Sequence, residues 1–282
     1  MIKVVISLLI ILNFYIQGRS QALKAYAPEI FPDKISGAVC GFSVDGSIIY
    51  FVREDTLQKK LFLYQAFRID NLWRNEKLLS FSGKYNDYGG RLNHNKTIFY
   101  FTSDRPGGSS RKGDQWNLWF SRKAGDTWKS PQPLVELNEK GDECCPVPLP
   151  DGQLLFSGSR GKDQEWLTFS WNGKKEAPVL PLNDSKAWQW PSFFDPKSGV
   201  YFFNSMKRPD TFGKDDIYVA FFKNNKWAAV KNIGSSINTE IYEDGAILSA
   251  DQQLLIFCRH ATASTPSRVL CVSWPELLDQ LK

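Results

Sequence analysis

The sequence predicts an all-β protein, a five-bladed β-propeller built of four-stranded antiparallel blades. Three observations lead to this prediction. The composition is rich in aromatic residues (14%), glycine (20 residues) and proline (15 residues), which favours strands joined by turns. A pattern of one turn between two apolar strands occurs five times along the chain. The stretches between these copies lack a convincing helical pattern, which argues against alternating strands and helices.

The repeated unit centres on a tight turn made of Asp-Gly or a related polar pair. The turns begin at residues 45, 95, 151, 195 and 251, which are 50, 56, 44 and 56 residues apart. Such pairs suit hairpins because they tolerate a positive φ. A regular period of this length is typical of proteins in which one supersecondary unit is repeated around an axis.

Each unit is predicted to contain four strands. The strand after the turn is almost entirely apolar (IIYFV, TIFYFT, LLFSG, VYFFN and LLIFC), as expected for a strand buried on both faces. A third strand is expected at residues 61–64, 117–120, 166–170, 217–221 and 268–273. A fourth, more exposed strand is expected within GDTWKSPQPLVELN and NNKWAAVKNIGSSIN. Because one unit cannot bury its own faces, the five are expected to pack around a common axis.

The two ends of the mature chain are expected to meet in the fifth blade. The fifth unit stops near Trp274, short of a fourth strand. Residues 23–31 have the same mixture of proline, apolar and acidic residues as the fourth-strand segment SPQPLVELN. We therefore predict that this N-terminal strand closes the last blade. Closure removes a sheet edge that would otherwise template aggregation.

Residues 1–22 have the features of a secretory signal peptide. Lys3 precedes an apolar run at 4–15, and Ser20 and Ala22 supply small residues at the expected cleavage positions. The run is shorter than a helix that spans a bilayer. We predict that residues 1–22 are removed and that residues 23–282 form the propeller domain of a periplasmic or secreted protein with no membrane span. The alternative is an uncleaved signal anchor.

Charge and cysteine content narrow the possible partners and cofactors. The chain has 35 Lys and Arg against 30 Asp and Glu, without the long basic run that would favour nucleic acid as a partner. Cys258 and Cys271 flank a hairpin loop symmetrically, so either a cross-strand disulfide or two buried thiols is compatible with the pattern. With only His94 and His260 present, no zinc-ligand spacing exists, and we expect no metal and no cofactor.

Two segments of the repeat carry a recognisable motif: FTSDRPGGSSRKGDQWNLW, from Phe101, and FFNSMKRPDTFGKDDIYVAFFKNNKWAAVKNIGSSINTEIYEDG, from Phe202. They resemble the TolB-type, WD-like propeller repeat family of exported bacterial proteins. The resemblance extends over nearly the whole mature chain, although the first, third and fifth copies lack parts of the loop motif. It implies a propeller fold and a role in binding proteins or glycans at the cell envelope.

One position of the repeated unit, which we call the register position, carries an acidic side chain in three of the five units. The residues eight positions before each turn are Gly37, Asp87, Glu143, Ala187 and Glu243. If the innermost strand of each blade begins there, the three carboxyl groups surround one mouth of the central channel. Such a set could act as an acid and base, coordinate a hard cation, or serve only to bond the backbone of the neighbouring blade.

Aromatic residues accompany this register. Aromatic rings around a concave polar mouth commonly hold sugars and peptides by stacking. Alternation along WQW places Trp188 and Trp190 on one strand face, so packing between blades explains these two equally well. We take seven residues as a candidate ligand-binding mouth: Asp87, Glu143, Glu243, Trp188, Trp190, Tyr88 and Tyr242.

We expect a monomeric binding or scaffold module that recognises an envelope protein segment or a glycan without catalysis. The sequence contains no nucleophile elbow, phosphate loop or Ser-His-Asp arrangement, so no catalytic residue is assigned. The alternative is a glycoside hydrolase or lyase that uses the carboxyl groups at the channel mouth. Arg105 and Arg208 recur after the second strand and are expected to tie their loops to a neighbouring blade. Asp215 and Asp216 are expected to accept hydrogen bonds in a turn.

Overall fold

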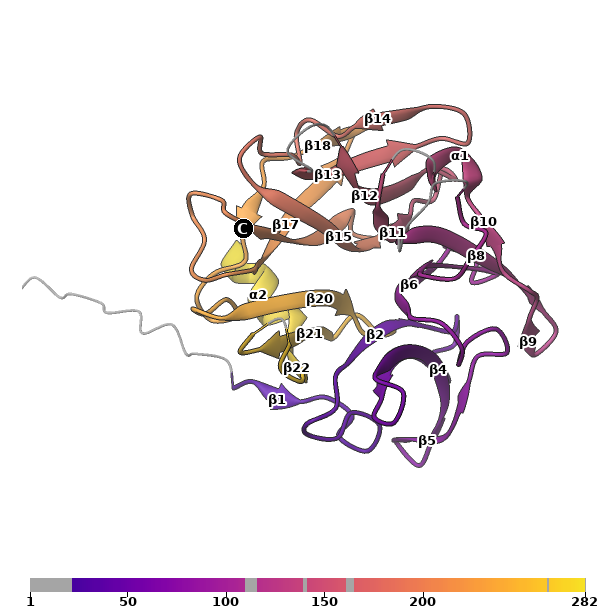
Figure 1. Cartoon of the computed structure of the whole chain (residues 1–282). Coiled ribbons are helices and arrows are strands. Elements are labelled where there is room, and N and C mark those ends of the chain that lie inside the picture. The colour runs from indigo at the N-terminus through magenta and orange to yellow at the C-terminus, as the bar shows by residue number, and fades with distance from the viewer. Residues whose placement is uncertain (1–21, 110–115, 139–140, 161–164, 263, 282) are drawn as a thin grey trace, which may run out of the picture.

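Five antiparallel sheets surround a common axis (Figure 1) in the computed structural model, which describes residues 22–109, 116–138, 141–160, 165–262 and 264–281. The innermost strands are β2 (Gly37–Phe42), β6 (Asp87–Leu92), β11 (Glu143–Pro148), β15 (Trp188–Asp195) and β20 (Tyr242–Leu248). Each innermost strand contacts the next one, and β20 contacts β2, so the ring is closed. The five-bladed prediction is confirmed. The predicted signal peptide falls, up to residue 21, outside the described residues.

The remaining strands follow outward in chain order. The second strands are β3 (Ile48–Asp55), β7 (Ile98–Ser103), β12 (Leu154–Arg160), β16 (Val200–Met206) and β21 (Leu254–His260). The third strands are β4 (Lys60–Ile69), β8 (Asn117–Ala124), β13 (Glu165–Trp171), β17 (Asp216–Lys223) and β22 (Arg268–Ser273). The fourth position holds β5 (Leu72–Leu78), β14 (Glu176–Pro178), the pair β9 (Thr127–Trp128) and β10 (Gln132–Pro133), and the pair β18 (Lys226–Trp227) and β19 (Lys231–Asn232). Every expected third strand lies within an observed one.

The hairpins between first and second strands have the expected backbone geometry. One residue in each turn has a positive φ: Gly46 (71°), Lys96 (59°), Gly152 (84°), Gly199 (70°) and Gln252 (58°). Lys96 and Gln252 adopt this conformation although they carry side chains that disfavour it. The hairpin therefore imposes its turn even where the sequence lacks glycine.

Every innermost strand contains a β-bulge at the same place. In β2 the register against β3 shifts between Val39 and Gly41, and the other four strands shift at equivalent points. A bulge bends its strand and re-aims the side chains beside it. The bulge segments border the axis of the ring, so this irregularity shapes the space at the centre.

The hydrophobic core lies between neighbouring blades. Blades 1 and 2 meet through Tyr50 and Phe99, whose ring centroids are 5.8 Å apart. Blades 4 and 5 meet through a cluster that includes Phe202 and Phe257, both fully buried. Burial of apolar surface stabilises a fold by roughly 25 cal/mol per Å². Packing of sheet against sheet therefore supplies the stability that one blade cannot supply alone.

The N-terminus closes the ring as predicted. Strand β1 (Lys24–Ala25) pairs with β22, with Lys24 opposite Cys271. The backbone N–H of Tyr26 adds a hydrogen bond to the carbonyl oxygen of Val269 at 2.9 Å. The closing strand has two residues, so it is shorter than the expected segment of residues 23–31.

After the fifth unit, the C-terminus forms helix α2 (Trp274–Leu281). Its buried residues, Trp274, Leu277 and Leu281, lie on one helical face and join the cluster between blades 4 and 5. The Trp274 ring packs edge-on against Phe202, with centroids 5.1 Å apart. Pro275 suits the first turn of a helix, where its missing N–H leaves no bond unmade. Among the described residues, no helix is long and apolar enough to cross a membrane.

An asparagine replaces part of the expected fourth strand in three blades. The chain of blade 2 ends in the short helix α1 (Val135–Asn138), where the sequence predicts strand. Asn138 accepts from the N–H of Leu118 at 2.9 Å and donates to its carbonyl oxygen at 3.0 Å. Asn183 and Asn238 bond their own third strands in the same way. A side-chain amide thus satisfies the edge of the third strand.

All five cysteines are free thiols. In the ladder between β21 and β22, Cys258 lies opposite Val269 and Cys271 lies opposite Ile256. The two cysteines are therefore two residues out of register. The disulfide that the sequence left open does not form, because neither thiol lies directly opposite the other.

Candidate functional site

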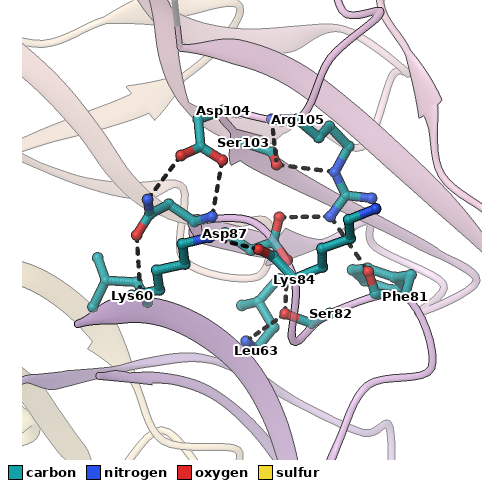
Figure 2. Close-up of polar contacts among 11 residues, drawn as sticks. Lys60, Leu63, Phe81, Ser82, Lys84, Asp87, Ser103, Asp104 and Arg105 are labelled. Atoms are coloured by element: carbon teal, nitrogen blue, oxygen red, sulfur yellow. Dashed lines mark hydrogen bonds and ion pairs between the residues drawn. The ribbon is translucent and has the colours of Figure 1, made fainter. Parts of the chain in front are cut away.

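Asp87, the acidic residue of the register in blade 2, is fully buried in an ion pair (Figure 2). Arg105 donates from Nη2 to Asp87 Oδ1 at 2.6 Å, and the Ser82 hydroxyl donates to Oδ2 at 2.7 Å. Burial raises the pKa of Asp87, and the Arg105 guanidinium opposes that rise. Asp87 therefore joins the first strand of its blade to the loop after the second strand.

The same contact recurs in blades 4 and 5. Arg259 donates from Nε to Glu243 Oε1 at 2.7 Å and from Nη2 to the carbonyl oxygen of Ile237 at 2.6 Å. In blade 4, Arg208 donates to Gln189 Oε1 at 3.0 Å and also reaches a backbone carbonyl of the preceding blade. The prediction that the recurring arginines tie loops to a neighbouring blade is confirmed.

Strand pairing corrects the register in blade 4. Counting eight residues back from Asp195 selects Ala187, but Asp195 pairs with Val200 and so lies where blade 2 has Asn93, two residues before the turn residue Asn95. In the ladder of innermost and second strands, Gln189 occupies the position that Asp87 occupies in blade 2. Gln189 is also fully buried. An amide in blade 4 and Gly37 in blade 1 therefore stand where the other three blades have an acid.

The three candidate acids do not border the axial space, which corrects the predicted ring of carboxyl groups. Asp87, Glu143 and Glu243 are each 0% exposed, and none is among the described residues that line the cavity at the axis. Successive side chains of a strand point to opposite faces. The residues that follow two of these acids, Tyr88 and Asp244, do line that cavity.

A cavity of about 660 Å³ lies on the axis where the innermost strands begin, and we call it the axial cavity. All five innermost strands contribute to its wall. Tyr88, Trp116 and Trp190 line it, and Tyr88 packs edge-on against Trp116 with ring centroids 4.8 Å apart. Two of the predicted aromatic residues therefore lie in one concave site. Its volume is within the range of small-ligand pockets.

Asp215 and Asp244 border the axial cavity, although the sequence analysis selected neither as a ligand-binding residue. Asp215 is 6% exposed and precedes β17. Asn204 donates from Nδ2 to Asp215 Oδ2 at 2.6 Å, whereas Oδ1 has no hydrogen-bond partner among the described residues. Burial and the nearby Asp244 carboxylate raise the pKa of Asp215 well above its usual range.

The prediction that both aspartates accept hydrogen bonds in a turn is confirmed for Asp216 and wrong for Asp215. Asp216 accepts from the backbone N–H groups of Phe212 and Gly213 at 2.7 and 3.1 Å. Asp215 instead forms an isolated bridge with Tyr242, at the start of β20. This bridge places the Asp215 carboxyl between blades 4 and 5, beside the axis. No spacing in the sequence distinguishes two adjacent aspartates with such different surroundings.

His260 lines the axial cavity next to Asp244, and Tyr242 packs against it. His260 Nε2 is 3.1 Å from Asp244 Oδ2, and the hydrogen bond raises the pKa of the imidazole. The Tyr242 ring stacks on the imidazole, with centroids 5.1 Å apart. Tyr242 is not one of the described residues that line the cavity; it supports His260, which lines it.

Trp188 and Trp190 lie on one face of β15, as alternation predicts. Their ring centroids are 6.4 Å apart, and the intervening Gln189 is buried on the other face. Trp190 borders the axial cavity. The Lys207 ammonium lies 3.8 Å from the centroid of the Trp188 ring. Both indoles are half-buried, so they remain available for contact with a ligand.

Arg91 forms the floor of the axial cavity. Its guanidinium is buried and donates to the carbonyl oxygens of Gly90 at 2.7 Å, Val39 at 3.4 Å and Ser192. Burial lowers the pKa of Arg91. Arg91 also borders a second cavity of about 290 Å³ at the turn end of the innermost strands. It therefore ties three blades together across the axis and separates the two cavities.

Cys145 contributes a strained residue to the wall of the axial cavity. Its φ is 58° at the bulge of β11, where blades 2 and 5 have Gly89 and Gly245 with φ of 59° and 66°. A non-glycine residue in this conformation costs roughly 1–2 kcal/mol. The backbone N–H of Cys145 is held by the Thr102 hydroxyl at 3.1 Å. Burial raises the pKa of the neighbouring Cys144 thiol, which disfavours its reactive thiolate form.

The polar groups of the axial cavity are suited to recognition by charge and hydrogen bonding. Within the ranges that the structure describes, no group of three or more His, Cys, Asp and Glu residues is placed to hold a metal ion. Asp215, Asp244, His260 and Asn204 instead combine carboxyl, imidazole and amide groups beside aromatic rings. Groups of these kinds can hydrogen-bond to a ligand.

One of the comparisons with solved structures supports the propeller fold. No protein-family model and no curated protein matches the chain. A candidate TolB from Agrobacterium tumefaciens superposes with a TM-score of 0.53 at 14% identity, over 84% of this chain and 76% of that chain. The β-propeller domain of the Trilobed protease from Pyrococcus furiosus gives a TM-score of 0.46 at 13% identity, over 84% and 81%. Trypanosoma rangeli sialidase in complex with the inhibitor DANA gives 0.48 at 9% identity, over 88% and 56%.

Proposed function

We propose that this protein is an exported, monomeric binding module whose axial cavity recognises a protein segment or a glycan at the cell envelope without transforming it. The observation that carries the proposal is the axial cavity itself. It brings the aromatic rings of Tyr88, Trp116 and Trp190 together with the carboxyl groups of Asp215 and Asp244. No single blade contains this combination, so only the closed ring assembles it.

The composition of the cavity supports binding. Aromatic rings supply a large contact area at a small cost in conformational entropy, and a few polar groups set the orientation of the ligand. Tyr88 and Trp190 lie on strands whose backbone is fixed by neighbouring strands, so little ordering of these rings is needed when a ligand binds. Arg91 closes the floor, which favours a ligand that enters from one end only.

The surroundings of Asp87, Glu143 and Glu243, the acids at the start of three innermost strands, favour recognition over catalysis. Asp87 and Glu243 are fully buried and bonded to arginines, and Glu143 is fully buried as well. A glycoside hydrolase that used these three residues would need them in contact with substrate. The resemblance of the repeat to the TolB-type family, together with the signal-like residues 1–22, supports a role at the cell envelope.

Glycan cleavage remains a second candidate because of one observation. Asp215 has a pKa raised by burial and lies near the Asp244 carboxylate. A protonated carboxyl group beside an ionised one is the arrangement by which glycoside hydrolases divide the roles of acid and base. In this candidate Asp215 is the acid, and Asp244 is the base or nucleophile.

A panel of defined glycans and synthetic peptides tests the proposal. Purified protein is titrated with each compound by calorimetry, and the compounds are then analysed by mass spectrometry. We expect at least one class to bind and to be recovered unchanged. Trp190→Ala should weaken that binding by tenfold or more, because stacking on one ring contributes about 1.4 kcal/mol or more.

Leu180→Ala is the matched control, because Leu180 is 74% exposed and is not one of the described residues that line the axial cavity. This variant should bind as the wild type does. Binding that survives Trp190→Ala would place the ligand elsewhere on the surface and contradict the proposal. Glycan turnover that Asp244→Asn abolishes would establish the second candidate.

A further inference from the structure

Asp215 is a buried carboxyl group whose hydrogen-bonding capacity is only partly used. Its Oδ2 accepts from Asn204, while Oδ1 is buried without a partner among the described residues. An ionised carboxylate left in this state is costly, because burial removes water that nothing replaces. Asp215 also borders the axial cavity. A donor that arrives from the cavity would supply what the fold leaves out.

The charges around Asp215 do not balance it. The titratable neighbours that act on its carboxyl are Asp244 on β20, Asp216 on β17 and Cys145 on β11, all of which oppose ionisation. His260 is engaged with Asp244. The nearby described cations are also engaged: Arg91 donates to backbone carbonyl oxygens, and Lys214 lies over the Tyr242 ring. Glu54 and Lys59, which also line the cavity, pair with each other at 3.6 Å.

We infer that the axial cavity takes a lysine or arginine side chain of a protein segment, with the cationic head group bound at Asp215. This inference rests on the binding role proposed above and narrows it to one ligand chemistry. The head group donates to the Asp215 carboxylate, and the nearby Asp244 adds a second negative charge. The ligand therefore supplies the donor and the positive charge that the fold omits.

The walls of the axial cavity suit the rest of such a side chain. Lysine and arginine carry a long apolar stem that packs on hydrophobic surface while the charged end reaches a polar site. Trp190, Tyr88 and Trp116 provide that surface, and aromatic faces also attract cations. The protein already pairs such groups two residues away on β15, where the Lys207 ammonium lies 3.8 Å from the centroid of the Trp188 ring.

The same geometry disfavours the other occupants. A neutral glycan donates hydroxyl hydrogen bonds, but it supplies no positive charge to stabilise the ionised form of Asp215. A divalent cation prefers six or more oxygen ligands, and the described residues contain no group of three His, Cys, Asp or Glu residues placed around one point. A monovalent organic cation needs only one or two acceptors.

Protons compete with a cationic ligand for the Asp215 carboxylate, so the affinity of the ligand should depend on pH in a characteristic way. A cation binds the ionised form of Asp215, and burial raises the pKa of that carboxyl. Affinity should therefore increase as the pH rises toward and through the raised pKa. A neutral ligand that accepts a hydrogen bond from the protonated carboxyl would show the opposite dependence, because it loses its donor as the pH rises.

The experiment uses the full chain and four probes: acetyl-Gly-Lys-Gly-amide, its norleucine analogue, chitotetraose and CaCl₂. Binding is measured by NMR titration at pH 5 and pH 8 for the wild type, Asp215→Asn and Asp151→Asn. Asp151 is an exposed turn residue, so Asp151→Asn removes the same charge far from the cavity. Thermal melting of each variant confirms that it folds.

We expect the lysine peptide to bind at least tenfold more tightly than the norleucine peptide at pH 8, and more tightly at pH 8 than at pH 5. Asp215→Asn should remove this preference, and Asp151→Asn should keep it. Equal binding of the two peptides, or no binding of the lysine peptide, would overturn the inference. So would binding of chitotetraose that weakens as the pH rises, or stabilisation by CaCl₂ that depends on Asp215.

These outcomes separate the inference from the function on which it rests. If Trp190→Ala abolishes binding of a neutral ligand while Asp215→Asn has no effect, the binding role holds and the cation inference fails. If no compound of the wider panel depends on Trp190, the binding role itself fails.

Discussion

The molecule contains two kinds of buried carboxyl group, and they have opposite surroundings. At the strand starts, Asp87 and Glu243 are 0% exposed, and each accepts from an arginine at 2.6–2.7 Å. At the axial cavity, Asp215 is 6% exposed and accepts only from the neutral amide of Asn204. The first kind is neutralised within its own blade, whereas the second lacks a cationic partner among the described residues.

This difference separates residues that hold the ring together from residues that are available to a ligand. A buried acid that pairs with an arginine, as in blades 2 and 5, joins neighbouring segments of the repeated unit and so stabilises the blade. A buried acid that occurs once and lacks a cation has no counterpart in the other blades. Burial alone therefore does not identify a functional acid. The presence or absence of a cationic partner distinguishes a structural acid from one that is available to a ligand.

The largest expected change in the free energy of unfolding follows from breaking the buried ion pair of blade 2. Arg105→Ala should lower the free energy of unfolding by about 3–5 kcal/mol, because it leaves Asp87 as an unpaired buried charge. The measurement is urea denaturation of the purified protein. Arg268→Ala is the control, because this arginine and its partner Asp33 are 66% and 84% exposed, and it should change stability by less than about 0.5 kcal/mol. Similar effects of the two substitutions would refute the structural role of Asp87.

At the axial cavity, replacing a buried charged side chain is expected to raise the free energy of unfolding instead of lowering it. The raised pKa of Asp215 means that the folded protein holds this proton more tightly than the unfolded chain does. Wild-type stability should therefore fall as the pH rises from about 4 toward the raised pKa, by about 1.4 kcal/mol for each pKa unit. Asp215→Asn removes this loss, so the variant should be more stable than the wild type at pH 8, and by less at pH 4. A variant that is less stable at both pH values would show that Asp215 has a structural role after all.

A smaller effect is expected at the neighbouring pair of His260 and Asp244. The hydrogen bond raises the pKa of His260, so its stabilising contribution is complete below the ordinary histidine pKa and is lost as the pH rises through the raised value. We expect Asp244→Asn to lower the pKa of His260 and to reduce stability at pH 6 by less than about 1 kcal/mol. NMR titration of the imidazole measures this, and His94→Gln makes the assignment unambiguous. An unchanged titration would exclude the pair from the electrostatics of the cavity.

The smallest effect concerns the strained bulge of blade 3. Cys145→Gly should stabilise the protein by about 0.5 kcal/mol, because the relief of strain at a φ of 58° slightly exceeds the added flexibility of the unfolded chain. Cys144→Gly should instead destabilise it by about 2 kcal/mol, since Cys144 is buried and its φ is not positive. Thermal melting compares the two variants. Stabilisation by both substitutions, or by neither, would contradict the assignment of strain to Cys145.

The ring could be predicted from the sequence because it is built from one local pattern of turn and strands that is repeated along the chain. Turns with a positive φ, buried second strands and the closing N-terminal strand each follow from residues that are close together in the chain. Helix α2 was not predicted, although Pro275 suits a first turn, because eight residues are too few for a helical period to stand out in the sequence. The helix is stabilised by Trp274 packing against Phe202 of another blade, a contact that no local pattern reveals.

The site was predicted only in part, and the reason is geometric. Tyr88 and Trp190 were identified because they adjoin the repeated register and lie on the axial face. Asp215 was assigned to a turn because its sequence surroundings match those of Asp216. A bridge to Tyr242, a residue of the next blade, is what brings Asp215 beside the axis. The register in blade 4 was displaced because Asp195 ends the first strand and does not lie within the turn, so the equivalent residue is Gln189 and not Ala187.

The most direct measurement is a titration of the Asp215 carboxyl carbon by NMR, with and without acetyl-Gly-Lys-Gly-amide. We expect a pKa above the ordinary range of an aspartate in the unbound protein, because burial and the Asp244 carboxylate oppose ionisation. We expect the peptide to lower this pKa, because the bound ammonium group stabilises the carboxylate. A pKa that is ordinary without the peptide, or one that the peptide leaves unchanged, would contradict the claim that Asp215 is kept without a cation for a ligand.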